Sequence, residues 1–359
     1  EEVARITGYD RIPASLPVAP PGRGLTKRQK SRRAVLTSLV GNSMTEVLNY
    51  PFLSESENRW FASDSASAVR LANAMQEESS ELRLSLLPAL IQAAARNLSR
   101  GITDLALFEE GSVFLPDGQV AKTADLPSGI IKPTAAQLAE LEATIPDQPR
   151  HLAGLLLGDR VQAQVGVAAI DFDYSDAIHA ARLVARVVGL ELTTRQASPK
   201  GYHPGRTAEL VVQTGEDIAV IGFAGELDPA LASENNLPRR VAAFEINLEK
   251  LYAVAPDVIT ATPIYNYPAA TQDVSLVVDE TLPAAELLSV IRAGAGELLE
   301  QVRLIDDYRG QNVADGKKSL TFALRFRAND RTLTQAEATA AKDDAVALAK
   351  EKFGAELRA

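Results

Sequence analysis

Hydrophobic residues recur at intervals of three and four along several segments of the chain, and this spacing predicts amphipathic helices. The first such segment follows Thr26 and carries an apolar stripe that includes Val35 and Leu39. Between these segments, alternating or continuous apolar runs predict strands. Up to residue 255, helices are expected over residues 27–40, 86–98, 135–143 and 176–188, and strands over residues 46–52, 105–111, 112–115, 151–157, 208–213 and 218–223. This order predicts a mixed α+β domain with a mostly antiparallel sheet.

The last third of the chain has a more regular order of elements. Its pattern predicts strand 273–279, helix 283–297, strand 301–308, strand 319–327, helix 335–353 and a short strand at 355–358. This is the βαββαβ plan of a ferredoxin-like domain. Strand 319–327 alternates cleanly, with apolar residues on one face and Arg325 and Arg327 on the other. Because both helices of such a fold cover the same face of the sheet, the arginines are expected on the open face.

Proline-rich segments set the expected domain limits. A helical pattern already runs at Glu1 without a capping residue ahead of it, and it gives way to prolines and glycines between residues 13 and 24. A second proline-containing stretch lies between residues 256 and 263. We therefore expect three parts: residues 1–23 as the end of a preceding helical domain plus a linker, residues 24–255 as the α+β core, and residues 263–359 as the ferredoxin-like domain.

The composition narrows the class of protein. The sequence is 46% hydrophobic and 23% charged, which is typical of a globular protein. The formal net charge of -10 argues against a protein whose whole surface binds nucleic acid, so any such contact depends on local basic patches. The lack of cysteine excludes disulfides and thiolate nucleophiles. Since the sequence has no membrane-length apolar run and no signal-peptide pattern, a cytoplasmic protein without a membrane partner is expected.

The sequence carries none of the common catalytic motifs. It has no P-loop, no dinucleotide-binding glycine motif after a strand, no zinc-protease motif and no nucleophile elbow. His203, close to Arg206, suits either an anion-binding loop or a structural turn, and the turn is the commoner case. The basic run from Arg23 to Arg33 suits RNA phosphate, an acidic partner or, more commonly, a solvated helix face. A free-standing enzyme is therefore disfavoured.

The open face of the ferredoxin-like sheet is the best candidate for binding RNA, because open sheets of this plan often bind single strands. The candidate contact residues are Lys317, Arg325, Arg327 and Arg331. Thr321 and Ala323 occupy positions where stacking aromatics would be expected, so the contacts must be polar and electrostatic. The domain has more acidic than basic residues, which leaves a protein-binding module as an alternative.

Several sequence stretches are distinctive when they are taken in order. They are EEVARITGYDRIP at residues 1–13, LRLSLLPAL at 82–90, Asn97, DLALFEEGSVF at 104–114, HPGRTA at 203–208, GFAGELDP at 222–229, DVSLVV at 273–278, KSL at 318–320, RTLT at 331–334 and LR at 357–358. Each is weakly specific alone, whereas their order and spacing are highly specific together. Over nearly its whole length the chain resembles the C-terminal part of bacterial phenylalanyl-tRNA synthetase beta subunits.

The resemblance implies a class II synthetase-like core that is noncatalytic. A working class II site needs an arginine for ATP phosphate and a glycine-rich strand that ends in arginine. The comparable strand here reads Leu-Phe-Glu-Glu-Gly and supplies carboxylates instead. The resemblance further implies a catalytic alpha subunit as partner in an α2β2 heterotetramer, tRNA-Phe as the RNA, and ATP used by the complete enzyme. This chain alone is expected to be inactive, and its roles would be assembly and placement of tRNA.

The family also places Mg²⁺ at the boundary between the alpha and beta subunits, with ligands from an Asp-x5-Asp-x2-Glu-Glu run. Glu1 and Glu2 match the last two ligands, and the two aspartates would lie upstream of residue 1. Because Mg²⁺ wants an octahedral array of oxygen ligands, a site made by these two carboxylates alone is expected to be empty or incomplete.

The sequence departs from the family pattern at three positions. Gln272 stands where arginine is usual, Asp228 where histidine is common, and Ala74 where proline is usual. The first departure removes one expected basic contact in the last domain. The alternative function is a noncatalytic RNA-binding or scaffold protein with a synthetase-like core. Association with an alpha subunit would separate the two hypotheses.

Overall fold

The structure, a computed structural model, describes residues 1–18, 22, 24–63, 66–116, 129–214, 217–261 and 264–358. The chain divides into two compact units, Glu1–Thr260 and Ala261–Ala359, here called unit 1 and unit 2. The expected start of the last domain at residue 263, part of the linker before residue 24, and Arg23 lie outside the described residues.

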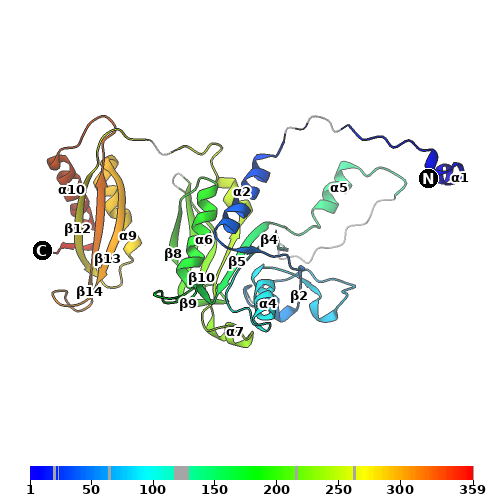
Figure 1. Ribbon diagram of the computed structural model, residues 1–359, viewed down its shortest axis with the longest axis horizontal. Coiled ribbons are helices and arrows are strands. Elements are labelled where there is room, and N and C mark those ends of the chain that lie inside the picture. Colours follow the sequence, from blue (N-terminus) through cyan, green and yellow to red (C-terminus); the bar gives the residue numbers. More distant parts are fainter. Residues whose placement is uncertain are drawn as a thin grey trace. The chain divides into compact units, whose positions relative to one another are not determined.

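Unit 1 is built on a seven-stranded sheet with the order β1-β4-β5-β11-β10-β9-β8 (Figure 1). The strands are β1 (Thr45–Glu46), β4 (Leu105–Ser112), β5 (Arg150–Leu157), β8 (Leu192–Gln196), β9 (Tyr202–Thr214), β10 (Asp217–Leu227) and β11 (Ala242–Asn247). Each neighbouring pair is antiparallel except β1 with β4, which is parallel. The expected mostly antiparallel sheet is thus confirmed.

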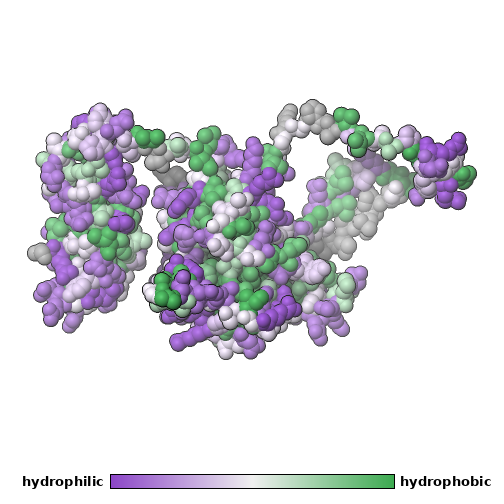
Figure 2. Space-filling view, viewed as in Figure 1, coloured by the Kyte–Doolittle hydropathy of each residue, from purple (hydrophilic) through white to green (hydrophobic). Residues whose placement is uncertain are grey.

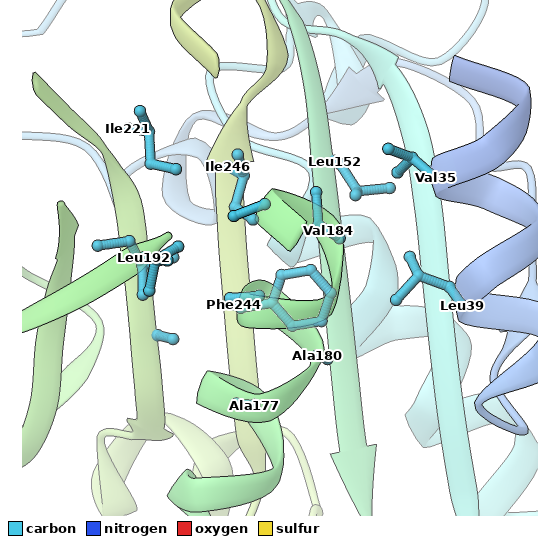
Figure 3. Close-up of a cluster of buried hydrophobic side chains, with 14 of the residues drawn as sticks. Val35, Leu39, Leu152, Ala177, Ala180, Val184, Leu192, Ile221, Phe244 and Ile246 are labelled. Atoms are coloured by element: carbon cyan, nitrogen blue, oxygen red, sulfur yellow. The ribbon is translucent and has the colours of Figure 1, made fainter. Parts of the chain in front are cut away.

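One face of this sheet is covered by helices α2 (Lys27–Gly41), α6 (Tyr174–Val187) and α8 (Leu248–Val254). A capping box between Thr26 and Gln29 fixes the start of α2, so that its apolar stripe faces the sheet. Val35 and Leu39 from α2 pack near Leu152 and Phe244 of the strands (Figure 3). Alanines on the buried side of α6 allow that helix to approach the sheet closely. This cluster forms the first core of unit 1.

The opposite face carries helices α4 (Leu87–Leu98) and α7 (Pro229–Glu234). Leu90 and Ile91 of α4 are fully buried against apolar residues of β4 and β5, such as Leu107 and Leu155. Successive residues of a strand point to opposite faces, so β4 supplies Leu107 to this second core and Phe108 to the first. The central strands of unit 1 are therefore buried on both sides.

Shorter elements complete unit 1. They are α1 (Glu2–Thr7), the 3₁₀ turns η1 (Tyr9–Arg11) and η2 (Glu77–Ser79), β2 (Phe52–Leu53), α3 (Glu55–Asn58), β3 (Glu81–Leu82), α5 (Ala135–Glu142), β6 (Asp159–Val161) and β7 (Ile170–Asp171). β2 pairs with β3, and β6 pairs with β7. The single strand expected over residues 46–52 is instead two short strands, β1 and β2, with Pro51 just before β2. Proline has no N–H to donate, so it interrupts regular pairing there.

Unit 2 is a four-stranded antiparallel sheet with two helices. Its elements are β12 (Ala270–Asp279), α9 (Ala284–Ala295), η3 (Gly296–Leu298), β13 (Leu299–Tyr308), β14 (Lys317–Phe326), α10 (Gln335–Phe353) and β15 (Glu356–Leu357). The strand order is β13-β14-β12-β15, so the expected βαββαβ plan is confirmed. The apolar face of β14, including Phe322 and Phe326, is fully buried beside residues of α9 and α10. Hydrophilic residues cover much of the visible surface of unit 2 (Figure 2).

Two bulges interrupt the regular alternation of edge strand β13. Its register with β14 shifts between Leu299 and Gln301 and again between Leu304 and Asp306. Each shift leaves one extra residue on β13, Glu300 in the first case and Ile305 in the second. An extra residue in one strand re-aims the side chains around it. Among the described residues of both units, no helix is long and apolar enough to cross a membrane.

Candidate functional site

Two glutamates lie on the same sheet face of unit 1, beneath α4. Glu109 of β4 and Glu245 of β11 are both register partners of Ala153 in β5. Because register partners point to the same face, the two carboxylates flank this alanine across three adjacent strands. This row brings two acidic side chains into the core of unit 1.

Glu109 is fully buried and is neutralised by the protein itself. Nη1 of Arg83 donates to Oε1 of Glu109 at 2.7 Å, and Nδ2 of Asn49 donates to Oε2 at 2.7 Å. Nε of Arg83 donates to the carbonyl oxygen of Ser112 at 2.9 Å. Gly111 leaves room for this guanidinium, since a Cβ at that position would collide with Arg83. The glycine of the Glu-Glu-Gly sequence thus has a packing role.

Glu245 forms the centre of a second polar group. Its Oε2 accepts from the Ser85 hydroxyl at 2.5 Å, and its Oε1 lies 2.8 Å from Nδ1 of His151. Burial, followed by the charge of Glu245, raises the pKa of the Tyr202 hydroxyl well above 10.0. Serine and histidine both contact the carboxylate here, whereas a nucleophilic triad needs the histidine between the other two. These residues therefore do not form an activated serine.

Glu110 points to the other face of the sheet, toward α2. Arg32 and Arg150 both donate to its carboxylate, at 2.6 Å and 2.5 Å for the closest contacts. Burial acts to raise the pKa of Glu110, but the hydrogen bonds and charges of the two arginines outweigh it, so the pKa lies below 4.5. Burial, then the charge of Glu110, raises the pKa of Tyr252 to about 12. Strand β4 therefore carries carboxylates that are saturated by internal cations.

The basic run on α2 is largely used within unit 1. Lys27 pairs with Asp257 at 2.7 Å, Arg28 pairs with Glu249, and Arg32 pairs with Glu110. These contacts attach the helix to the sheet and to α8. For Lys27, Arg28 and Arg32, these contacts favour a structural role over a dedicated RNA-binding role.

The loop around His203 also has internal partners. Nδ1 of His203 accepts a 3.0 Å hydrogen bond from the backbone N–H of Gly205, and Arg206 pairs with Glu226 at 2.8 Å. The arginine that would attract an anion is therefore already neutralised. Of the two interpretations made from the sequence, these contacts favour the structural turn.

A cavity of about 880 Å³ lies beside the segment that joins β1 to β2. Tyr50 and Phe52 stack at its wall with ring centroids 6.5 Å apart. Leu48 and Met75, which also line it, are 89% and 102% exposed. Asn49 faces inward and holds this segment to Glu109. An apolar surface of this kind is typical of a contact with another protein.

In unit 2, the candidate RNA-contacting residues are exposed to different degrees. Arg325 donates to Glu300 at 2.8 Å and its side chain remains 45% exposed. Arg327 also donates to Glu300, at 3.0 Å, and to the carbonyl oxygen of Tyr267, and its side chain is only 9% exposed. The bulge at Glu300 thus gives two arginines one shared carboxylate.

The other two candidates lie near the ends of unit 2 elements. Arg331 pairs with Asp330 at 3.1 Å and with Glu337 at 2.8 Å, ahead of α10. Lys317 begins β14 and is exposed, with Asp279 as its register partner. The structure therefore brings Arg325 and Arg327 together at Glu300. Arg331 and Lys317 have other partners.

Sequence reasoning missed Arg303 of β13. Its register partner is Ala323, whose neighbours Phe322 and Leu324 are buried beneath the helices, so Arg303 lies on the open face. It is exposed. Val302 and Leu304 alternate normally on either side of it, so period-two counting along β13 places Arg303 on the open face from the sequence.

Glu1 and Glu2, the two candidate Mg²⁺ ligands, lie at the start of α1. Both are exposed, and Glu2 pairs with Arg5 at 2.7 Å. Within the ranges that the structure describes, no group of three or more acidic or histidine side chains is arranged to hold a metal ion. These two carboxylates alone do not supply the octahedral oxygen array that Mg²⁺ requires.

Unit 2 belongs to the class of anticodon-binding domains, since residues 266–358 match the family described as "Ferredoxin-fold anticodon binding domain". The particular family is given by unit 1. Residues 12–248 match the family described as "Phenylalanyl tRNA synthetase beta chain CLM domain". The chain therefore belongs to the phenylalanyl-tRNA synthetase beta chain family, which confirms the resemblance found in the sequence.

Curated relatives agree with this assignment. The chain is 52% identical to the phenylalanine–tRNA ligase beta subunit of Leifsonia xyli and 47% identical to that of Thermobifida fusca, in each case over 100% of this chain. It spans 42% and 43% of the length of these two proteins. A solved pyrrolysyl-tRNA synthetase from Desulfitobacterium hafniense is also similar, with a TM-score of 0.43 and 14% identity over 64% of this chain and 69% of that one.

Proposed function

We propose that this chain is a noncatalytic part of the beta subunit of phenylalanine–tRNA ligase. It would support the ATP-dependent attachment of phenylalanine to tRNA-Phe by assembling with a catalytic alpha subunit and by binding the tRNA. Membership of the family and the names of the curated relatives support this proposal. A cytoplasmic location follows from this function, because charged tRNA is consumed by translation.

The noncatalytic assignment rests on the two carboxylates of strand β4 and on the arginines that already pair with them. The leaving pyrophosphate of an adenylation reaction is strongly anionic, so a catalytic strand must present cations to it. Here the strand presents Glu109 and Glu110, and each carboxylate already binds the protein's own arginines. A second anion at this strand would have to displace the buried pair of Arg83 with Glu109 or the part-buried pairs of Glu110. ATP would therefore be bound and used by the partner.

The surface beside the 880 Å³ cavity supports the assembly role. Leu48 and Tyr50 are 89% and 83% exposed, although they follow directly from a strand of the main sheet. Burial of exposed apolar side chains is the main favourable term in protein association. We infer that the alpha subunit covers this surface and that the complete enzyme is an α2β2 heterotetramer.

For the tRNA contact, we propose the open sheet face of unit 2, with Arg325 and Lys317 as direct donors to phosphate. Arg331, fixed by Asp330 and Glu337, would contribute from the start of α10. Arg327 shares Glu300 with Arg325 and lies at the same corner of the sheet. Any Mg²⁺ at Glu1 and Glu2 would need further ligands, so no part of the mechanism is assigned to that ion.

An assembly and charging assay tests the proposal. The beta subunit that carries these residues is co-expressed with the alpha subunit of the same organism, and attachment of radioactive phenylalanine to a tRNA-Phe transcript is measured. Charging well above that of the alpha subunit alone, together with co-purification of both chains, is expected. If the two chains do not associate and charging does not rise, the alternative of an RNA-binding or scaffold protein is favoured.

A further inference from the structure

We propose that Arg303 is a second phosphate-binding residue on the open face of unit 2, acting beside Arg325, and that Arg327 is a positioning residue that does not touch RNA. The proposal rests on the tRNA-binding role given above, and it distinguishes the arginines that contact RNA from the arginine that positions them. It follows from strand register, exposure and the partners of each guanidinium.

Strand register places Arg303 and Arg325 next to each other. Arg303 of β13 is the partner of Ala323 in β14, and Gln301 is the partner of Arg325. The two arginines are therefore diagonal neighbours on adjacent antiparallel strands, for which side chains lie roughly 7–8 Å apart. Side chains as long as arginine can reach one phosphate, or two successive phosphates, from such positions.

The sheet surface between the two arginines is formed by small side chains. Ala323 and Thr321 are small, and the Thr321 hydroxyl lies 2.9 Å from the Ser275 hydroxyl on the neighbouring strand. With no aromatic ring at these positions, bases have nothing to stack on. Contacts with phosphate position a nucleic acid without reading its sequence, and two arginines over a floor of small residues suit that kind of contact.

Arg303 is also the better donor of the two because it is not committed elsewhere. Among the residues that the structure describes, no carboxylate lies within ion-pair distance of Arg303, whereas Arg325 pairs with Glu300 and Arg309 pairs with Glu280 and Asp307. Asp273 lies on the same open face, since it too is a register partner of Ala323. This carboxylate would repel phosphate from the β12 side and so direct the RNA backbone toward β13.

Arg327 has a different role. Its side chain is 9% exposed, and its guanidinium binds Glu300 and the Tyr267 carbonyl oxygen while lying 5.0 Å from the centroid of the Tyr265 ring. These contacts use Nε, Nη1 and one face of the guanidinium. They fix the segment before β12 to the end of β14. Arg327 thus holds the framework in which Glu300 and Arg325 are placed.

The test measures binding of a tRNA-Phe transcript to the full chain at a series of KCl concentrations. Arg303→Gln and Arg325→Gln are compared with Arg292→Gln, which removes the same charge from an exposed site on helix α9. Each lost phosphate contact should reduce the steepness of log K against log salt by about 0.7–0.9. We expect that reduction, with several-fold weaker binding, for Arg303→Gln and Arg325→Gln, and wild-type behaviour for Arg292→Gln.

Two results would overturn the role of Arg303. One is an Arg303→Gln variant that binds tRNA with the same salt dependence as Arg292→Gln. The other is an Arg303→Gln variant that keeps tRNA binding but loses association with the alpha subunit, which would make this face a protein contact. If the wild-type chain shows no tRNA binding at all, the proposed function itself fails, and that outcome differs from both.

Hydrogen exchange tests the role of Arg327. Arg327→Gln should speed amide exchange in the segment around Tyr265 and Tyr267. The salt dependence of tRNA binding by this variant should match that of Arg292→Gln. A loss of salt dependence as large as that of Arg325→Gln, with unchanged exchange in this segment, would instead make Arg327 a phosphate contact.

Discussion

Arg83 donates a 2.7 Å hydrogen bond to the fully buried carboxylate of Glu109, on the face of the unit 1 sheet that α4 covers. The arginine comes from the loop before α4 and the glutamate from β4, so the pair joins two parts of the core. Through Asn49, the same carboxylate also holds the exposed segment beside the cavity. One buried charge pair therefore supports both the core and the proposed assembly surface.

Removing one partner of this pair should strongly destabilise unit 1. Arg83→Met leaves Glu109 buried with only an amide as partner, and such a change costs about 3–5 kcal/mol of the free energy of unfolding. Chemical denaturation followed by tryptophan fluorescence would report the loss, since Trp60 packs against the same core.

An exposed ion pair provides the matched control. Arg195 lies 2.7 Å from Glu209 and its side chain is 51% exposed, so Arg195→Met should cost less than about 1 kcal/mol. Equal losses for the two variants would contradict the role given to burial. The double variant Arg83→Met/Glu109→Leu should recover part of the stability, because no unpaired charge is left behind.

The start of α10 should make unit 2 sensitive to acid. Hydrogen bonds from Arg331, then from the backbone and hydroxyl of Thr334, lower the pKa of Glu337 from 4.5 to about 2. A carboxylate with a lowered folded-state pKa stabilises the fold above pH 4.5, and this contribution is lost as the pH falls toward 2. Glu337→Gln should therefore lower stability at neutral pH and flatten the pH dependence of unit 2 in that window.

Carbon-13 NMR titration of the Glu337 carboxyl measures the same effect directly. Glu351→Gln, at an exposed position on the same helix, serves as the control for removing a charge from α10. An ordinary pKa for Glu337 would show that its contacts with Arg331 and Thr334 do not persist in solution.

Polar substitution at the cavity surface should weaken subunit association without unfolding the chain. Leu48 and Met75 are 89% and 102% exposed, so Leu48→Ser and Met75→Ser remove little buried area from the folded chain. Burial of a large apolar side chain contributes about 1.5–3 kcal/mol to the free energy of association. If the alpha subunit covers these residues, each change should therefore raise the dissociation constant about tenfold or more.

Isothermal titration with the alpha subunit measures this effect, and Val165→Ser is the control. Val165 is 105% exposed but lies between β6 and β7, away in sequence from the cavity residues. Should all three variants bind the alpha subunit as the wild type does, the contact surface must lie elsewhere.

Gly294 allows the two helices of unit 2 to approach each other. A Cβ at this position would lie 2.7 Å from the Cα of Ala345 in α10. Gly294→Ala should therefore destabilise unit 2 by about 1–3 kcal/mol through overpacking. Gly41 is also in a helix but has open space around it. Gly41→Ala should therefore raise the free energy of unfolding of unit 1 by up to about 1 kcal/mol. Thermal unfolding of both variants distinguishes crowding from helix propensity.

Periodic segments with ordinary geometry were predicted well from the sequence. Strand 319–327 alternates without interruption, and its apolar side chains are buried as expected. Strands β8 and β11 were not expected. β8 reads Leu-Thr-Thr-Arg-Gln at the sheet edge and has a single buried residue, and β11 mixes alanine with a glutamate whose partners come from distant segments. Local pattern carries no signal for such long-range partners.

The candidate site was limited by the same physical cause. The arginines of β14 were found because alternation gives their face directly. The sharing of Glu300 by Arg325 and Arg327 was not found, because it depends on β13, where Glu300 and Ile305 each shift the register by one residue. A shift of one residue moves following side chains to the opposite face, so counting along the sequence fails there.

The bulges of β13 have a further consequence for the behaviour of the chain in concentrated solution. Among the described strands, β13 is an outer strand that pairs with β14, and its outer edge could template the strand of a second molecule. Bulges, together with the charged residues Asp306 and Asp307 near that edge, make it a poor template. The irregularity that gives Arg325 and Arg327 a shared carboxylate therefore also protects unit 2 from edge-to-edge aggregation.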